Sequence, residues 1–261
     1  MTLPCQLDLS FAPGSRGRTI LAERRASYPY SITAPIVQAD GTARLTLQSI
    51  SGGLYGGETL SQHIRLGAGA SARLVQPAAT TVRRRAQAGP ARQSIRLEVG
   101  AGARLIYATR PLIMLPGSAL RQDWEVSLAP GALVILWDGF VSHSPKGEAP
   151  DWMLASRLTA RTAEGRLLAA ERMVVQGAAL GSGFQGASGA FSAFGKFWCL
   201  GATAGITPAE TVLRGLDNIR TGSTALPGHA GFTIALAASD GGALSAAMDQ
   251  ILARLDAPSS R

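Results

Sequence analysis

The 261-residue chain has few charged residues, few cysteines and no long apolar run. Its two cysteines, Cys5 and Cys199, lie far apart and form no CxxC pair, which argues against a disulfide framework. No stretch approaches the ~20 apolar residues that a membrane-spanning helix needs, and the first residues lack the apolar segment of a signal peptide. The chain is therefore expected to be a cytoplasmic protein that does not associate with membranes.

Recognisable catalytic motifs are also absent. The three histidines, His63, His143 and His229, show no HxH or HExxH spacing, and no serine lies in a GxSxG elbow. Neither cysteine has a neighbouring activating base. These absences predict a binding or scaffolding protein rather than an enzyme, with no tightly bound cofactor.

Two glycine-rich segments match nucleotide-binding motifs only superficially. Residues Gly181–Gly186 fit GxGxxG, but the glycines that follow make a poor helix. Residues Gly189–Lys196 resemble a P-loop, yet the spacing is one residue too long and Phe197 stands where Ser or Thr would meet magnesium. We interpret both as chance matches and residues 177–195 as a loop or a region of close backbone packing.

Acidic residues are missing between Glu58 and Glu98, although the net charge of the chain is +8. The seven arginines of this interval are Arg65, Arg73, Arg83, Arg84, Arg85, Arg92 and Arg96. They predict a positive surface that would steer an acidic protein partner, with Arg83, Arg84 and Arg85 as candidate partner-binding residues. Nucleic acid is the competing interpretation, but no interleaved aromatic residues support it.

A strand–turn–strand unit occurs three times in the middle of the chain. Its turns read Gly67-Ala68-Gly69-Ala70, Gly100-Ala101-Gly102-Ala103 and Ala129-Pro130-Gly131-Ala132, and the aligned glycines are 33 and then 29 residues apart. Such a unit cannot bury its apolar face alone and needs stacked neighbours. The sequence therefore predicts a mainly β fold, an elongated coiled stack of sheets, with the repeats at about 59–138.

Shorter patterns predict the remaining elements of what we expect to be a single domain, 1–261. Alternating residues indicate strands near 6–10 and 43–48, a hairpin at 153–175 with its turn at Glu164-Gly165, and a last strand at 231–238. Two helices are expected in the C-terminal region of about 206–255, one at 208–218 and one at 243–255 with Asp240 as a candidate cap. A loop is expected from Asp138 to Asp151.

Three carboxylates lie next to glycine-rich or apolar segments, where a charged side chain must be paired, hydrogen-bonded or hydrated. Glu58 closes the cluster Ser51–Gly57, Asp138 follows the wholly apolar stretch 133–137, and Glu171 lies within an apolar strand segment. One interpretation is ordinary ion pairing, with Arg172 as the partner of Glu171. The other is a polar path through the interior that passes a hydrated cation by oxygen contacts.

Taken in order, these motifs resemble the UreD (UreH) family of urease accessory proteins. The resemblance rests on the glycines Gly52, Gly53, Gly56 and Gly57 before Glu58, on residues 76–83 and 112–118, on Trp137-Asp138, and on Gly147 and Glu148. It covers residues 17 to about 175 well and the C-terminal part more loosely. Departures from the family pattern include Glu58 in place of the usual aspartate, and Thr81 and Arg83 in place of a lysine and an aromatic residue.

The resemblance implies a helicoid β fold and a non-catalytic role in maturing the nickel enzyme urease. Proteins of this family form a complex with UreF and the GTPase UreG, dock on apo-urease and help Ni²⁺ reach its active site. Glu58, Asp138 and Glu171 would then line a transient Ni²⁺ path as oxygen donors. Two alternatives stay open: a scaffold of the same fold with a different client, and an unrecognised hydrolase that uses Asp138 or Glu148.

Overall fold

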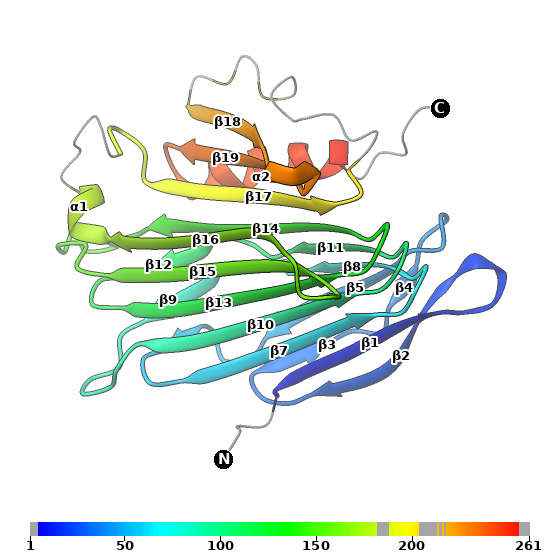
Figure 1. The fold of residues 1–261 in the computed structure, drawn as a ribbon. Coiled ribbons are helices and arrows are strands. Elements are labelled where there is room, and N and C mark those ends of the chain that lie inside the picture. Colours follow the sequence, from blue (N-terminus) through cyan, green and yellow to red (C-terminus); the bar gives the residue numbers. More distant parts are fainter. Residues whose placement is uncertain (1–4, 182–187, 204–212, 214–215, 217, 256–261) are drawn as a thin grey trace.

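The computed structural model describes residues 5–181, 188–203, 213, 216 and 218–255 and is mostly β-sheet (Figure 1). The chain winds as a β-solenoid of about four turns, so that two sheets face each other across a core. The predicted mainly β, coiled architecture is confirmed.

One wall of the solenoid is a seven-stranded sheet that runs from β16 at one edge to β2 at the other. Its strands, in spatial order, are β16 (Leu167–Gln176), β15 (Met153–Thr162), β13 (Ala119–Leu128), β10 (Ala91–Val99), β7 (Thr59–Leu66), β1 (Leu7–Pro13) and β2 (Thr19–Ala26).

The opposite wall is a twelve-stranded sheet, eight of whose strands form a continuous path. In spatial order these are β18 (Ile219–Ala225), β19 (Gly231–Ala238), β17 (Ala193–Gly201), β14 (Leu133–Ser142), β11 (Arg104–Ala108), β8 (Ser71–Val75), β5 (Ala43–Ser49) and β3 (Tyr30–Ile32). The shorter strands β4 (Ile36–Val37), β6 (Leu54–Tyr55), β9 (Thr80–Arg83) and β12 (Leu112–Met114) lie beside this path. The helices are α1 (Gly177–Gly181) and α2 (Gly241–Leu255), with 3₁₀ turns at Ser15–Gly17 and Pro227–His229.

The repeated small-residue turns are the corners of the solenoid. Each one carries the chain from the first wall to the second, as from β7 to β8, so the two strands of a unit pair with their counterparts in the next coil and not with each other. Gly69, Gly102 and Gly131 have φ of 71°, 62° and 71°, which only glycine adopts without strain. The corners also bond to one another, since the amide of Gly69 donates to the carbonyl of Ala101 (2.8 Å).

Antiparallel strands close the C-terminal end of the solenoid. The predicted hairpin is confirmed as β15 and β16, and the predicted last strand as β19. The helix predicted at 243–255 is α2, and its cap is Asp240, whose Oδ1 accepts from the amide of Ala243 (2.9 Å). Within the described part of the chain, no helix has the length and apolarity to cross a membrane.

Other predictions for this region were wrong or fall outside the described residues. The interval 177–195 contains a short helix, α1, and the start of β17, so it is a loop only in part. The helix predicted at 208–218 and most of the GxGxxG segment lie outside the described residues. The loop predicted from Asp138 is wrong in its start, because Phe140 and Val141 continue the strand pattern and β14 runs to Ser142.

Strand β14 is covered on both faces, as its unbroken apolar stretch predicts. Val134 and Leu136 pack in the core between the two sheets. Ile135 and Trp137 face the opposite way, into a second core that α2 closes over β17 and β19 (Figure 1). The twelve-stranded sheet is therefore a shared wall between two cores, and Asp138 follows directly on this buried stretch.

The packing of Trp137 can be tested at Gly195, its neighbour on β17. A Cβ at Gly195 would overlap the indole ring of Trp137. We expect Gly195→Ala to lower the free energy of unfolding by about 1–3 kcal/mol, the usual cost of overpacking, in a urea titration. The control is Gly222→Ala on β18, where an added Cβ has no heavy atom within 4 Å. Equal stability of the two variants would contradict the packing described here.

Candidate functional site

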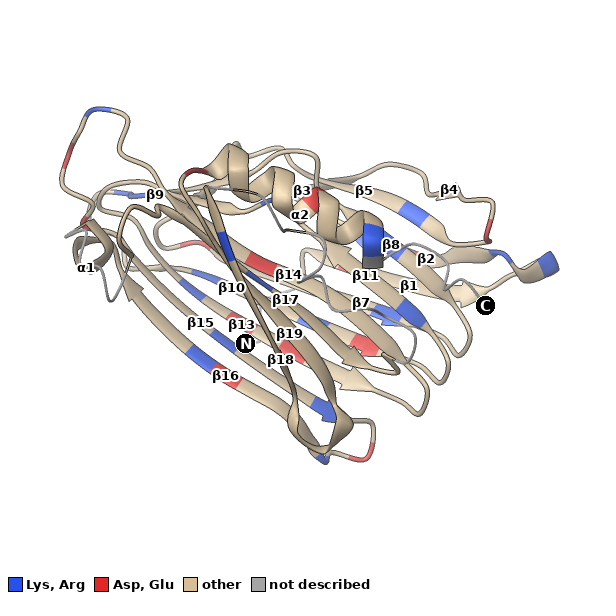
Figure 2. Ribbon diagram, turned by 90° about the horizontal axis from the view of Figure 1, so that it is seen from above, with Lys and Arg blue, Asp and Glu red and all other residues tan. Residues whose placement is uncertain are grey.

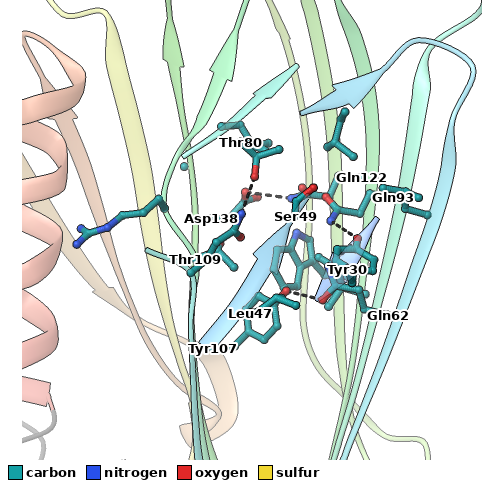
Figure 3. A pocket seen from close by; sticks show the side chains of 18 of the residues that line it. Tyr30, Leu47, Ser49, Gln62, Thr80, Gln93, Tyr107, Thr109, Gln122 and Asp138 are labelled. Carbon is teal, nitrogen blue, oxygen red and sulfur yellow. Dashed lines mark hydrogen bonds between the residues drawn. The ribbon is translucent and has the colours of Figure 1, made fainter. Parts of the chain in front are cut away.

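A small polar cavity lies between the two sheets (Figure 3). Its volume is about 40 Å³, and since a water molecule needs roughly 10–15 Å³ in this measure, about three waters fit. The lining combines apolar side chains with the polar residues Gln62, Gln76, Thr80, Gln93, Thr109 and Gln122. It also includes Arg110, whose guanidinium pairs with Asp249 (2.9 Å). Amide and hydroxyl groups of this kind bind water or a cation through oxygen, and they are unusual at the centre of an apolar core.

The register of the solenoid creates this polar lining. Gln93 on β10 lies directly opposite Gln122 on β13, which in turn lies opposite Ser156 on β15. Successive coils repeat the same inward-facing position, so one polar position becomes a row of polar side chains. The sequence analysis missed this row, although Gln93 and Gln122 share the 29-residue spacing of the second and third corner glycines.

Buried hydrogen bonds fix one side of the cavity. The hydroxyl of Tyr107 donates to Gln62 Oε1 (2.7 Å), and Gln62 Nε2 donates to the hydroxyl of Tyr30 (2.9 Å) (Figure 3). Burial raises the pKa of both tyrosines, so both hydroxyls stay neutral: that of Tyr107 donates to Gln62, and that of Tyr30 accepts from it. Trp124 lines the same cavity, and its buried indole N–H has no acceptor among the described residues. Buried donors of this kind are normally satisfied by ordered water, so the cavity is suited to hold it.

Asp138 is the carboxylate that lines the cavity. It is surrounded by protein and keeps an intermediate exposure because it borders this internal space. Gln122 Nε2 donates to Oδ1 and Ser156 Oγ donates to Oδ2, each at 3.0 Å. Burial raises the pKa of Asp138, against the effect of these two hydrogen bonds, and the nearby charge of Glu171 raises it further while Lys196 lowers it.

Glu171 lies at the edge of the polar interior and pairs with a residue that the sequence analysis did not assign to it. Its partner is Lys196 Nζ, from β17 of the opposite sheet. The expected pairing with Arg172 is wrong, because neighbouring residues of a strand point to opposite faces and Arg172 lies across from Arg157. Lys196 is in turn directly opposite Asp138. The structure thus brings Asp138, Lys196 and Glu171 together.

Glu58 lies in the turn between β6 and β7 and is half-buried. Its Oε2 accepts from the amide of Tyr55 (3.0 Å) and so closes the turn that contains Gly56 and Gly57. It does not line the cavity, but its charge acts on Tyr30, which does. Of the three predicted carboxylates, only Asp138 therefore lines the cavity, whereas Glu171 lies on the edge strand and Glu58 in a separate turn. Within the described ranges, no group of three or more His, Cys, Asp or Glu side chains is placed to hold a metal ion.

The arginines of the acid-free interval do not form one surface. Arg65 and Arg96 project from the outer face of the seven-stranded sheet, where Arg65 pairs with Asp8 (3.0 Å) and Arg96 with Glu98 (2.9 Å). Arg73 belongs to the opposite sheet. Figure 2 shows charges of both signs distributed over the strands. The expectation of a single positive surface from Arg65 to Arg96 is therefore wrong. The exposed residues Arg83, Arg84 and Arg85 form a separate group at the end of β9.

Comparisons with known proteins agree with the order of the sequence motifs. A model of the UreD urease accessory protein family matches residues 4–260. The chain belongs to the UreD urease accessory protein family.

Relatives named urease accessory protein UreD 1 resemble the chain over most of its length. The protein of Methylorubrum populi is 36% identical, covering 94% of this chain and 85% of the relative. That of Methylorubrum extorquens is 37% identical with the same coverage, and that of Pseudomonas syringae pv. syringae is 31% identical, covering 95% and 90%. Membership of the UreD family supports a role in urease maturation.

The glycines of the UreD resemblance shape turns. Gly53 has φ of 157° and Gly57 has φ of 82°, and the backbone of Gly53 lies against Thr81 of β9. Gly56 donates its amide to the carbonyl of Arg83 (3.0 Å). The cluster therefore carries the chain past β9, at the base of the exposed arginines.

The other motif glycine, Gly147, has φ of 69° in the turn that follows Ser144. In the same turn Ser144 Oγ donates to the carbonyl of Glu148 (2.7 Å), and the side chain of Glu148 is exposed. Gly147 and Glu148 thus belong to a surface turn away from the cavity.

The raised pKa of Asp138 predicts a pH-dependent stability. A folded-state pKa above the unfolded value of about 3.9 means that the folded protein binds the proton more tightly, so stability falls as pH rises through this window. We expect Asp138→Asn to be more stable than the wild type at pH 7, because the amide buries no charge, its Oδ1 can accept from Gln122, and its Nδ2 can donate to Ser156 Oγ. This advantage should shrink toward pH 4 in unfolding titrations with EDTA. A difference that is independent of pH would contradict the assignment.

Proposed function

We propose that this chain is a urease maturation factor that forms a complex with UreF and UreG, docks on apo-urease and helps to deliver Ni²⁺ to the active site. Family membership supports the link to urease. The observation that supports the handling of a cation is the polar interior, in which Asp138 borders a cavity whose lining includes glutamine and threonine side chains.

The chemistry of this interior suits brief contact better than storage. Carboxylate, amide and hydroxyl oxygens are weaker ligands for Ni²⁺ than imidazole or thiolate. In a narrow polar passage, such oxygens replace part of the hydration shell of an ion and still let it leave. Glu58 near Tyr30, Asp138 at the cavity and Glu171 at the edge of β16 would provide successive negative charges along the route.

The protein acts in this proposal as a non-catalytic cytoplasmic scaffold, with Ni²⁺ as its cargo and without a resident cofactor. A strain that lacks the gene should show no urease activity at ordinary nickel concentration, and full activity in that strain would contradict the proposal.

The contribution of the carboxylates can be tested by complementing this strain. We expect Asp138→Ala and Glu58→Ala to remain folded and to join the complex, but to lower urease activation severalfold because the route loses a negative charge. The matched control is Glu125→Ala, which removes an exposed carboxylate from the outer face of β13, the strand that carries Gln122. Activation that is unchanged in both interior variants would reduce Glu58 and Asp138 to structural hydrogen-bond partners.

The exposed arginines are the proposed contact with an acidic partner surface. Reversal of Arg83, Arg84 and Arg85 to glutamate should slow association with the UreF–UreG complex about tenfold or more at low salt, and less at high salt, since charge steering is screened. Association rates measured by surface plasmon resonance at several salt concentrations would show this. The control reverses three exposed arginines on the outer face of the seven-stranded sheet, Arg92, Arg121 and Arg172, so that the change in net charge is the same. An equal loss of rate in both variants would indicate a general effect of net charge.

A further inference from the structure

A single ammonium group lies at the edge of the polar interior. Lys196 Nζ pairs with Glu171 Oε1, and both side chains are about one-third exposed, at 30% and 34%. Glu171 belongs to β16, the last strand of the seven-stranded sheet, whereas Lys196 belongs to β17 of the opposite wall. The ion pair therefore bridges the two sheets at the side where β16 is the edge strand of the seven-stranded sheet.

Lys196 is also adjacent to Asp138. The two residues are direct partners in the antiparallel pairing of β14 and β17, so their side chains lie on the same face of the sheet, toward the polar interior. The charge of Lys196 acts on Asp138, as does that of Glu171. The ammonium of Lys196 thus pairs with Glu171 and acts through its charge on Asp138, the two carboxylates that a metal cation would meet at this edge.

The same ammonium has a further contact on its own strand. The ring of Trp198, two residues further along β17 and on the same face, has its centroid 5.2 Å from Lys196 Nζ. This distance allows a cation–π interaction, so Nζ can leave the carboxylate without losing all its stabilising contacts. Lysine suits such a movement, because its flexible chain carries a point charge, whereas arginine would bind Glu171 through a rigid two-pronged contact.

We propose that Lys196 is a gate at the Glu171 edge of the polar interior: its ammonium holds the place of a cation, and a divalent cation passes between Glu171 and Asp138 only when Nζ moves away from Glu171. The inference rests on the proposed function, because it assigns to Lys196 the control of that cation route. The ammonium repels a divalent ion, so it keeps the route empty until the ion or a docked partner displaces it.

The gate predicts that removal of the lysine charge tightens cation binding. We expect full-length protein with Lys196→Gln, freed of metal with EDTA and dialysed, to bind Ni²⁺ about tenfold more tightly than the wild type in calorimetric titrations, because one repelling charge is lost in a partly solvated site. Lys196→Arg keeps the charge and should bind no more tightly than the wild type. Lys146→Gln, in the exposed turn near Gly147, is the matched control for net charge and should have no effect.

A double variant in which both Glu171 and Lys196 are replaced by glutamine separates the effect of charge from loss of the fold. Glu171→Gln should weaken Ni²⁺ binding, and adding Lys196→Gln to it should restore tighter binding while the two amides can still bond to each other. Thermal unfolding checks that each variant is native. A native Lys196→Gln protein with wild-type affinity, or a double variant that binds no better than Glu171→Gln alone, would overturn the gate.

Urease activation separates failure of the gate from failure of the proposed route. If Asp138→Ala lowers activation while Lys196→Gln changes neither Ni²⁺ affinity nor activation, the gate is wrong and the route stands. If Asp138→Ala leaves activation unchanged, the route itself fails. If both the route and the gate are correct, Lys196→Gln should alter the nickel concentration at which urease activation is half-maximal. Loss of an ion pair with only a structural role would not change this concentration.

Discussion

Parallel stacking in register is the constraint on which the rest of this structure depends. Each coil places its strands directly beside those of the preceding coil, as β10 does between β7 and β13. Apolar positions then form continuous columns, and the core between the sheets arises from a short pattern used repeatedly. The same rule propagates any exception. A polar residue at one inward position meets its counterpart in the next coil, and the row Gln93, Gln122 and Ser156 is the outcome.

A polar row of this kind costs stability unless every group has a partner. Most of its members satisfy one another: Gln62 lies between two tyrosine hydroxyls, and Asp138 accepts from Gln122 and Ser156. The indole N–H of Trp124 is the exception among the described residues of the cavity lining, since it is buried without an acceptor. The fold thus keeps a cavity with polar groups between the two sheets, which is large enough for water and consistent with the proposed passage of an ion.

The sequence predicts the coil better than it predicts the interior. The corner glycines, the strand spacing and the helix at 243–255 are local signals, and all of them are confirmed. The pairing of Glu171 with Lys196 joins strands of opposite sheets, and no pattern in one strand encodes it. The sequence marks Asp138 as unusual because it follows an apolar stretch. Its place within β14 depends on the pairing of Gly139, Phe140 and Val141 with β17, which the sequence around Asp138 alone does not predict. The arginines between Glu58 and Glu98 suggest one surface because they follow one another in sequence. The turns at the corners place them on different sheets, with Arg65 and Arg96 on one and Arg73 on the other.

The central claim is that the cavity beside Asp138 lies on the route of a metal ion. The most direct measurement is anomalous diffraction at the nickel absorption edge from crystals soaked in Ni²⁺. The account predicts an anomalous peak in the cavity, within bonding distance of the Asp138 carboxylate or of the amide oxygens that face it. Peaks confined to surface groups such as His143 or His229, with only water in the cavity at saturating Ni²⁺, would contradict it.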